Sequence, residues 1–152
     1  MTTHTSPASD CSAAATRLAT YFEQLSRDNV AKLADYYASD ARFKDPFNDV
    51  RGIAAIRKIF EHMFEALERP HFVVTRQVVQ GAHCFLTWEF RFGFLRFKQG
   101  QPQVILGATH LEFSEDGLVT LHRDYWDAAE ELYEKLPAVG GLMRWLKRRA
   151  NS

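Results

Sequence analysis

The sequence predicts an α+β domain in which three N-terminal helices pack on a strongly curved, mainly antiparallel sheet of four to six strands. Two observations lead to this prediction. Apolar residues recur with a period of about 3.6 before Pro70 and with a period of about 2 after it. One long segment of the second half alternates apolar and polar residues, and the apolar face of such a sheet has to be covered by other elements.

Length, composition and charge limit the number of domains and the kinds of partner. The chain has 152 residues, of which 46% are hydrophobic, and this suffices for one domain with a substantial core. Lys+Arg and Asp+Glu each total 19, so we expect neither nucleic acid nor a membrane surface as a partner. Cysteine usage and an N-terminus without a signal-peptide pattern predict a cytoplasmic protein. We divide the chain into a disordered leader (1–11), a single domain (12–137) and a basic C-terminal tail (138–152).

The N-terminal half predicts a helical hairpin and then a third helix. The first helix spans about 12–27, and Asn29 is expected to cap a short second helix that reaches Tyr37. A third helix is expected after Gly52. Its buried stripe is predicted to consist of Ile53, Ile56, Phe60, Met63 and Leu67.

The second half predicts four strands in an antiparallel meander. Turn signals separate residues 72–80, 84–97, 103–113 and 119–127. In the longest strand one face is expected to be apolar. That face comprises Cys84, Leu86, Trp88, Phe90, Phe92 and Phe94.

The C-terminal tail is a short basic amphipathic stretch. We expect Leu142, Trp145 and Leu146 to dock on the domain and the basic residues to be solvated.

Helices that cover a curved sheet tend to leave an apolar cavity with a few polar groups. Strand alternation places His122, Asp124 and Trp126 on the inward face of the last strand, with Thr109 on the strand before it. Burial raises the pKa of a carboxylic acid, which suits general acid/base catalysis near neutrality. Asp124 is therefore a candidate acid/base, and the alternative is that Asp124 pairs with His122 or Arg123 and stabilises the sheet.

The stretch ARFKDPFNDVRG contains a second candidate carboxylate, Asp45. Pro46 disfavours helical geometry at Asp45, and an Asp-Pro pair followed by Asn48 and Asp49 is typical of a turn. Asp45 is either a catalytic acid/base or a turn residue that accepts backbone hydrogen bonds.

Several stretches together resemble the NTF2-like superfamily, particularly its SnoaL-like and ketosteroid-isomerase-like branches. They are the helical hairpin with Tyr21, the segment ASDARFKDPFNDVRGIAAIRKIF, and the strands that end in LEFSEDGLVTLHRDYWD. The resemblance covers about residues 18–136. It implies a cone-shaped (cystatin-like) α+β fold and a homodimer packed through the outer sheet face, where Glu89, Arg91 and Arg123 would be partners.

The branches of the superfamily imply different catalytic residues. In the steroid isomerases an Asp in an Asp-Pro motif moves the proton, and Asp45 and Tyr21 match the base and one oxyanion donor. The second donor there is a protonated aspartate, whereas this chain has Thr109, so steroid isomerisation is not expected. The SnoaL-like cyclases use an Asp on the last strands, which Asp124 matches. The limonene epoxide hydrolases need an Arg and an Asp two residues apart on an inner strand. Here Glu89 and Arg91 stand in reversed order and face outward.

These residues favour a cofactor-free enzyme that moves protons on a small hydrophobic carbonyl compound. No P-loop, dinucleotide fingerprint or metal-ligand cluster is recognised, so neither a cofactor nor a metal is expected. The alternatives are a non-catalytic small-ligand or protein-binding module and a purely structural dimerisation module. The candidate catalytic residues are Asp124, Asp45, Tyr21 and His122, and the candidate ligand contacts are Thr109, Trp88, Phe90, Trp126 and Phe47.

Overall fold

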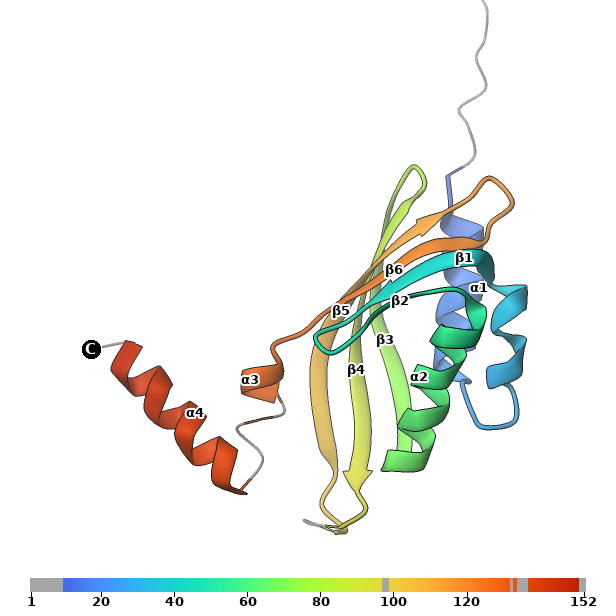
Figure 1. The fold of residues 1–152 in the computed structure, drawn as a ribbon. Helices are drawn as coiled ribbons and strands as arrows, with labels where there is room; N and C mark the ends of the chain where they lie inside the picture. Colours follow the sequence, from blue (N-terminus) through green and yellow to red (C-terminus); the bar gives the residue numbers. More distant parts are fainter. Residues whose placement is uncertain (1–9, 97–98, 132, 134–136, 151–152) are drawn as a thin grey trace, which may run out of the picture.

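The computed structural model describes residues 10–96, 99–131, 133 and 137–150 (Figure 1). It contains helices and a single six-stranded sheet in the order β2-β1-β6-β5-β4-β3. The elements are α1 (Ser12–Glu23), the 3₁₀-helix η1 (Val30–Asp35), β1 (Tyr37–Lys44), β2 (Asp49–Arg51), α2 (Ile53–Ala66), β3 (Leu67–Gln80), β4 (His83–Phe94), β5 (Gln103–Phe113), β6 (Val119–Tyr125), α3 (Ala128–Glu131) and α4 (Pro137–Ala150).

The predicted α+β class and the four-strand meander are confirmed. Strands β3, β4, β5 and β6 pair antiparallel in chain order. Two further strands come from the stretch that was predicted only as a short extended segment. Strand β1 pairs in parallel with β6 and antiparallel with β2. The hairpin of β1 and β2 therefore extends the sheet at the edge that carries β6.

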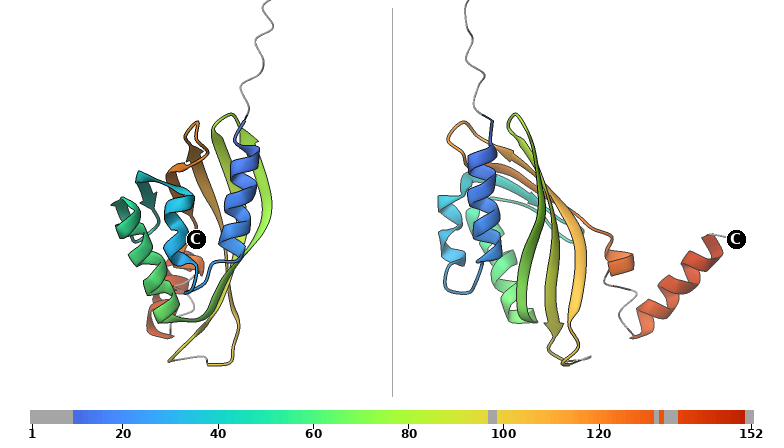
Figure 2. Two further views of the ribbon diagram at one scale, coloured as in Figure 1. Left: turned by 90° about the vertical axis from the view of Figure 1, so that its right-hand side faces the viewer. Right: turned by 180° about the vertical axis from the view of Figure 1, so that it is seen from behind.

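The N-terminal helices cover one face of the curved sheet, as Figure 2 shows from two sides. Helix α1 packs on β3, and α2 packs on β1 and β3. The second helix differs from the prediction, because it is a 3₁₀ turn and Tyr37 begins β1 instead. Nor does Asn29 cap it, since the Asn29 side chain accepts from the Ser26 amide and donates to the Gln24 carbonyl.

Strand β3 begins five residues before the predicted start. It follows α2 without a loop, so the prediction that Leu67 belongs to the helix is wrong. Pro70 lacks an amide proton, and the ladder to β4 shifts register between Glu68 and His71, where Arg69 takes a φ of 47°. This bulge accommodates the proline inside the strand.

The inward alternation of the sheet is confirmed in β4 and β5. Cys84, Leu86 and Trp88 are buried, as is Leu111 on the facing strand. Trp88 lies opposite Gly107, where an added Cβ would meet the indole ring at 2.3 Å. The absence of a side chain at Gly107 therefore allows the indole to lie flat on β5.

The two ends of the chain were predicted as a leader (1–11) and a basic tail (138–152). Residues 1–9 of the leader lie outside the described residues, but Cys11 is buried and its amide donates to the Gly81 carbonyl. The tail forms α4, which lies apart from the sheet in Figure 1. Leu142, Trp145 and Leu146 are exposed on α4, so the prediction that they dock on the domain is wrong. No helix in the described part of the chain is long and apolar enough to cross a membrane.

Candidate active site

Two neighbouring strands place three polar side chains on the buried face of the sheet. Thr109 of β5 lies directly opposite Asp124 of β6, and His122 lies two residues before Asp124 on the same face. Thr109 and His122 are 2% and 3% exposed, and Asp124 is half-buried. Polar groups buried this deeply need partners.

The partners form one continuous chain of hydrogen bonds. The Trp88 Nε1–H group can only donate, and it donates to Thr109 Oγ1 at 2.8 Å. The single hydroxyl proton of Thr109 is then directed to Asp124 Oδ1 at 2.6 Å. His122 Nε2 lies 2.7 Å from the same oxygen. Asp124 Oδ1 therefore has two partners, whereas among the described residues no group hydrogen-bonds to Oδ2.

The far side of His122 faces Tyr37 of β1. Tyr37 Oη lies 2.6 Å from His122 Nδ1, and both side chains are buried. Burial raises the pKa of Tyr37 well above its ordinary value of 10.0, and the negative charge of Asp124 adds to this shift. Tyr37 thus keeps its proton. With a neutral imidazole, Tyr37 donates to Nδ1, and His122 carries its own proton on Nε2, directed at the Asp124 carboxylate.

Aromatic rings surround the imidazole of His122. The Phe43 ring lies 4.6 Å from it and the Phe22 ring 5.5 Å, measured between centroids. These rings exclude water from the hydrogen bonds of His122, and in a dry environment such bonds hold their geometry more strongly.

A small hollow of about 20 Å³ lies against Asp124, between the sheet and the helices. This volume is about that of a single water molecule. The predicted apolar lining is present, but the hollow is far smaller than the 300–1,000 Å³ that is usual for a ligand pocket, by about an order of magnitude. The lining residues are Phe22, Phe60, Phe72, Val74, Trp88, Thr109, His122 and Asp124.

A second, open hollow of about 560 Å³ lies on the other side of Asp124. It brings together both predicted carboxylates, Asp45 and Asp124, and it includes Trp126. The Phe47 ring, which is exposed, packs edge-on against Trp126 at 5.7 Å. Trp126 thus lines the open hollow and Phe47 packs against it, whereas Phe90 lines neither hollow and stacks on Phe72 at 4.6 Å.

The carboxylate of Asp45 is occupied by the turn between β1 and β2. Its Oδ1 accepts hydrogen bonds from the amides of Phe47 and Asn48 at 2.8 and 2.7 Å. The Asn48 side-chain amide donates to both Asp45 oxygens. Of the two roles considered for Asp45, this geometry matches the turn residue.

Tyr21 lies away from Asp124. Its hydroxyl donates to the Asn29 carbonyl at 3.1 Å, and its ring stacks on Tyr36 at 4.1 Å. Tyr21 lines neither hollow beside Asp124.

The hydroxyl in contact with the buried network is that of Tyr37, which the sequence placed on a helix. The signal that could have found it is the β-favouring composition of YASDARFK, which forms β1.

A group of metal-ligating side chains lies on the opposite, outer face of the sheet. His83, His110 and Glu112 each offer a ligand atom, and these atoms lie within 4.8 Å of one another. The sequence alone did not indicate this group, because His83 lies 27 residues before His110 and only the pairing of β4 with β5 brings it close to His110 and Glu112.

Comparisons with known proteins agree with the fold. Residues 18–122 match the SnoaL-like domain family. No curated protein matches the chain significantly.

Three solved structures illustrate the similarity. A protein with a ketosteroid isomerase-like fold from Catenulispora acidiphila, solved with trimethylamine, shares 17% identity at a TM-score of 0.66, over 78% of this chain and 88% of that one. A SnoaL-like polyketide cyclase from Jannaschia, whose assignment is itself provisional, shares 19% identity at a TM-score of 0.66, over 79% of this chain and 87% of that one. An LEH-like epoxide hydrolase from M. tuberculosis shares 15% identity at a TM-score of 0.65, over 88% of this chain and 91% of that one. At these identities the likeness concerns the fold.

Proposed function

The chain belongs to the SnoaL-like domain family, and on this premise we propose that it is a cofactor-free acid/base enzyme in which Asp124 transfers protons on a small hydrophobic carbonyl compound. The reaction would be an isomerisation or a ring closure. The observation that supports the proposal best is the chain of hydrogen bonds that converges on Asp124 Oδ1 and, among the described residues, leaves Oδ2 without a donor.

Each member of the network has a distinct part in this chemistry. The hydrogen bonds from Thr109 and His122 to Oδ1 hold the carboxylate in one orientation, so that Oδ2 is the atom that takes a proton. Tyr37 fixes the ring of His122 and acts as a positioning residue. When Oδ2 removes a proton from the carbon beside a carbonyl, the electrons of that C–H bond form an enolate. Oδ2 then returns the proton, so no cofactor is consumed.

The size of the inner hollow determines how a substrate would reach Oδ2. A compound larger than water enters only if an aromatic side chain turns aside. Phe72 is the candidate, because it is half-buried and packs edge-on against Trp88 at 5.5 Å. The open hollow offers a second approach, and there Lys44 could stabilise the negative charge of an enolate oxygen.

A non-catalytic binding module is the second candidate function. The small volume of the inner hollow favours it, because a space of about 20 Å³ holds no more than about one water molecule. The hydrogen bonds to Asp124 Oδ1 would be the same in a purely structural network. In that case Asp124 would stabilise the junction of β5 and β6 and take no part in chemistry.

Deuterium exchange distinguishes the two functions without knowledge of the natural substrate. An enzyme of the proposed kind should incorporate deuterium from D₂O at the carbon beside the carbonyl of cyclic ketones and β-dicarbonyl compounds, which mass spectrometry detects. We expect wild-type protein to accelerate exchange in at least one such compound and Asp124→Asn to abolish the acceleration. The asparagine carbonyl can still accept from Thr109 and His122, so the fold should persist.

Asp45→Asn is the matched control for this experiment. The substitution also removes one charge from the open hollow, and its carbonyl can still accept from the amides of Phe47 and Asn48. Exchange should stay at the wild-type rate in Asp45→Asn. Equal exchange in Asp124→Asn and wild type would refute the assignment, and a compound that binds to the wild type without any exchange would favour the binding module.

The outer face of the sheet is proposed to pack against a second copy of the chain. Large apolar side chains are exposed there, among them Val78, Phe85 and Leu106 at 62%, 47% and 58%. Charged residues on the same face include Glu89 and Arg91, which pair with each other at 2.6 Å. We expect wild-type protein to sediment as a dimer and Leu106→Arg to sediment as a monomer, and a monomeric wild type would exclude this arrangement.

A further inference from the structure

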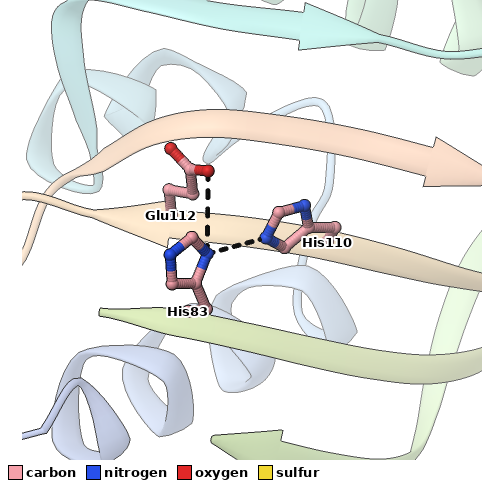
Figure 3. Close-up of side chains that lie close together, drawn as sticks. All are labelled: His83, His110 and Glu112. Atoms are coloured by element: carbon pink, nitrogen blue, oxygen red, sulfur yellow. Dashed lines mark hydrogen bonds and ion pairs between the residues drawn. The ribbon is translucent and has the colours of Figure 1, made fainter. Parts of the chain in front are cut away.

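Three side chains with metal-ligating atoms meet on the outer face of the sheet, where β4 begins and β5 ends (Figure 3). His83 Nδ1 lies 2.9 Å from His110 Nε2 and 3.6 Å from Glu112 Oε1. The group is separate from Asp124, because it lies on the other face of the sheet.

The strand register explains why these residues converge. His83 of β4 lies directly opposite Glu112 of β5. His110 precedes Glu112 by two residues, so both point to the same face, and His110 is the diagonal neighbour of His83. The positions of all three side chains are therefore determined by two paired strands and depend on no loop.

The distances are close to those of a zinc site. Zinc binds nitrogen and oxygen at about 2.0–2.2 Å, so two ligand atoms of a tetrahedral site lie about 3.3 Å apart. The separation of His83 and Glu112 is slightly longer than this value and that of the two histidines is slightly shorter. Shifts of a few tenths of an ångström would bring these two pairs to the ligand distance, and the ligand atoms of the third pair, His110 and Glu112, lie within 4.8 Å of each other.

Near the two imidazoles, one charged side chain attracts a cation and another repels it. The two ring nitrogens share one proton, and an ion can bind between them once that proton moves to the far nitrogen of its own ring. Glu112 supplies a negative charge, while Arg123, which lies opposite His110, supplies a positive one.

In the single chain, the surroundings hold the ligands in place and keep the group accessible. The Phe85 ring lies parallel to the His110 ring at 4.6 Å, which fixes the orientation of that imidazole. The side chains of His83 and Glu112 are 51% and 41% exposed. An ion bound by the three residues would therefore retain water in its remaining coordination positions, as in zinc sites with three protein ligands.

We propose that His83, His110 and Glu112 bind one divalent transition-metal ion of the Zn²⁺ type on the outer face of the sheet. Two imidazoles and one carboxylate suit Zn²⁺, Co²⁺ or Ni²⁺, whereas Mg²⁺ and Ca²⁺ require oxygen ligands. This site goes beyond the acid/base function and does not depend on it.

Titration calorimetry of the full chain, without an affinity tag, tests the proposal. We expect ZnCl₂ to bind with one strong site per chain and MgCl₂ to give no binding. His110→Ala and Glu112→Gln should each weaken Zn²⁺ binding at least about tenfold, because the loss of an outer-shell partner alone costs 10–100-fold in such sites. With Co²⁺ in place of Zn²⁺, visible ligand-field bands should appear in wild type and disappear in both variants.

His62→Ala is the matched control, because His62 is exposed on α2 and lies outside the cluster. It should bind Zn²⁺ as wild type does. Glu112→Gln keeps the size of the side chain and lies at an accessible position, so a loss of binding with an unchanged circular dichroism spectrum reports on the ligand itself. Absence of a strong Zn²⁺ site in wild type, or equal affinity in wild type, His110→Ala and Glu112→Gln, would overturn the proposal.

Discussion

Each face of the sheet carries a histidine beside a carboxylate, and the two pairs differ in their access to water. On the inner face His122 lies 2.7 Å from Asp124, with side chains 4% and 16% exposed. On the outer face His83 lies 3.6 Å from Glu112, with side chains about half exposed. On the inner face, water cannot replace a lost hydrogen-bond partner, so each hydrogen bond depends on one particular donor and one particular acceptor. Outside, water or an ion can replace any partner. Burial therefore determines what the same two side chains can do.

Removal of each histidine should give the largest difference between the faces. His122→Ala creates a buried cavity, leaves the Tyr37 hydroxyl without a partner and leaves Asp124 with Thr109 alone, so we expect a loss of about 3 kcal/mol or more in the free energy of unfolding. His83→Ala should change it by no more than about 0.5 kcal/mol. Urea denaturation measures both values, and similar losses in the two variants would contradict the comparison.

Gly107→Ala should have the next largest effect on the inner face. The new methyl group would meet the Trp88 ring, which then has to leave the position from which it donates to Thr109. We expect a loss of about 1–3 kcal/mol and a change in tryptophan fluorescence. Gly141→Ala is the control. Gly141 lies in α4, and a Cβ added there would meet no atom within 4 Å. Unchanged stability and fluorescence in Gly107→Ala would count against the close packing of Trp88.

Two tyrosines allow a finer test of the network. Tyr37→Phe removes the donor to His122 Nδ1 and leaves a buried acceptor unsatisfied, so we expect a loss of about 1–3 kcal/mol. Tyr21→Phe removes a hydrogen bond to a half-buried backbone carbonyl that water can reach, and it should cost less than about 1 kcal/mol. Thermal unfolding of both variants shows the order, and a larger loss in Tyr21→Phe would reverse it.

Alkaline pH should give the smallest effect and should act on the inner face. Burial raises the pKa of Cys84 from 9.0 to about 11 and that of Tyr21 from 10.0 to about 12. The unfolded state then loses these protons at lower pH than the folded state does. Stability should therefore be constant below pH 9 and fall as the pH rises towards 11 and beyond.

Cys84→Ala isolates one part of this alkaline effect. Without the thiol, the fall in stability between pH 9 and 11 should become shallower, which urea titrations at a series of pH values would show. An unchanged slope would mean that the Cys84 thiol ionises equally in both states.

Periodicity predicted most of the fold because burial itself is periodic. The inward alternation of Cys84, Leu86 and Trp88 follows directly from a sheet covered on one side, and it placed Thr109, His122 and Asp124 on one face. The 3₁₀ turn and β1 were harder to predict, since an apolar pattern of only a few residues fits either element. Tyr37 was assigned to a helix for this reason, and its contact with His122 remained hidden.

The candidate site was only partly predictable, because contacts across strands depend on register. The spacing of His122 and Asp124 is local and was recognised. The approach of His83 to His110 requires that β4 and β5 pair with His83 opposite Glu112, which no single segment indicates. The size of the inner hollow depends on how Phe22, Phe60 and Phe72 pack, and composition does not determine packing.

Imidazole nitrogen NMR with and without Zn²⁺ tests the contrast between the two faces most directly. We predict that His122 is the tautomer with its proton on Nε2 and that Zn²⁺ leaves its signals unchanged, while the signals of His83 and His110 shift at one equivalent. A His122 proton on Nδ1, or Zn²⁺-dependent shifts at His122 without shifts at His83 and His110, would contradict the account.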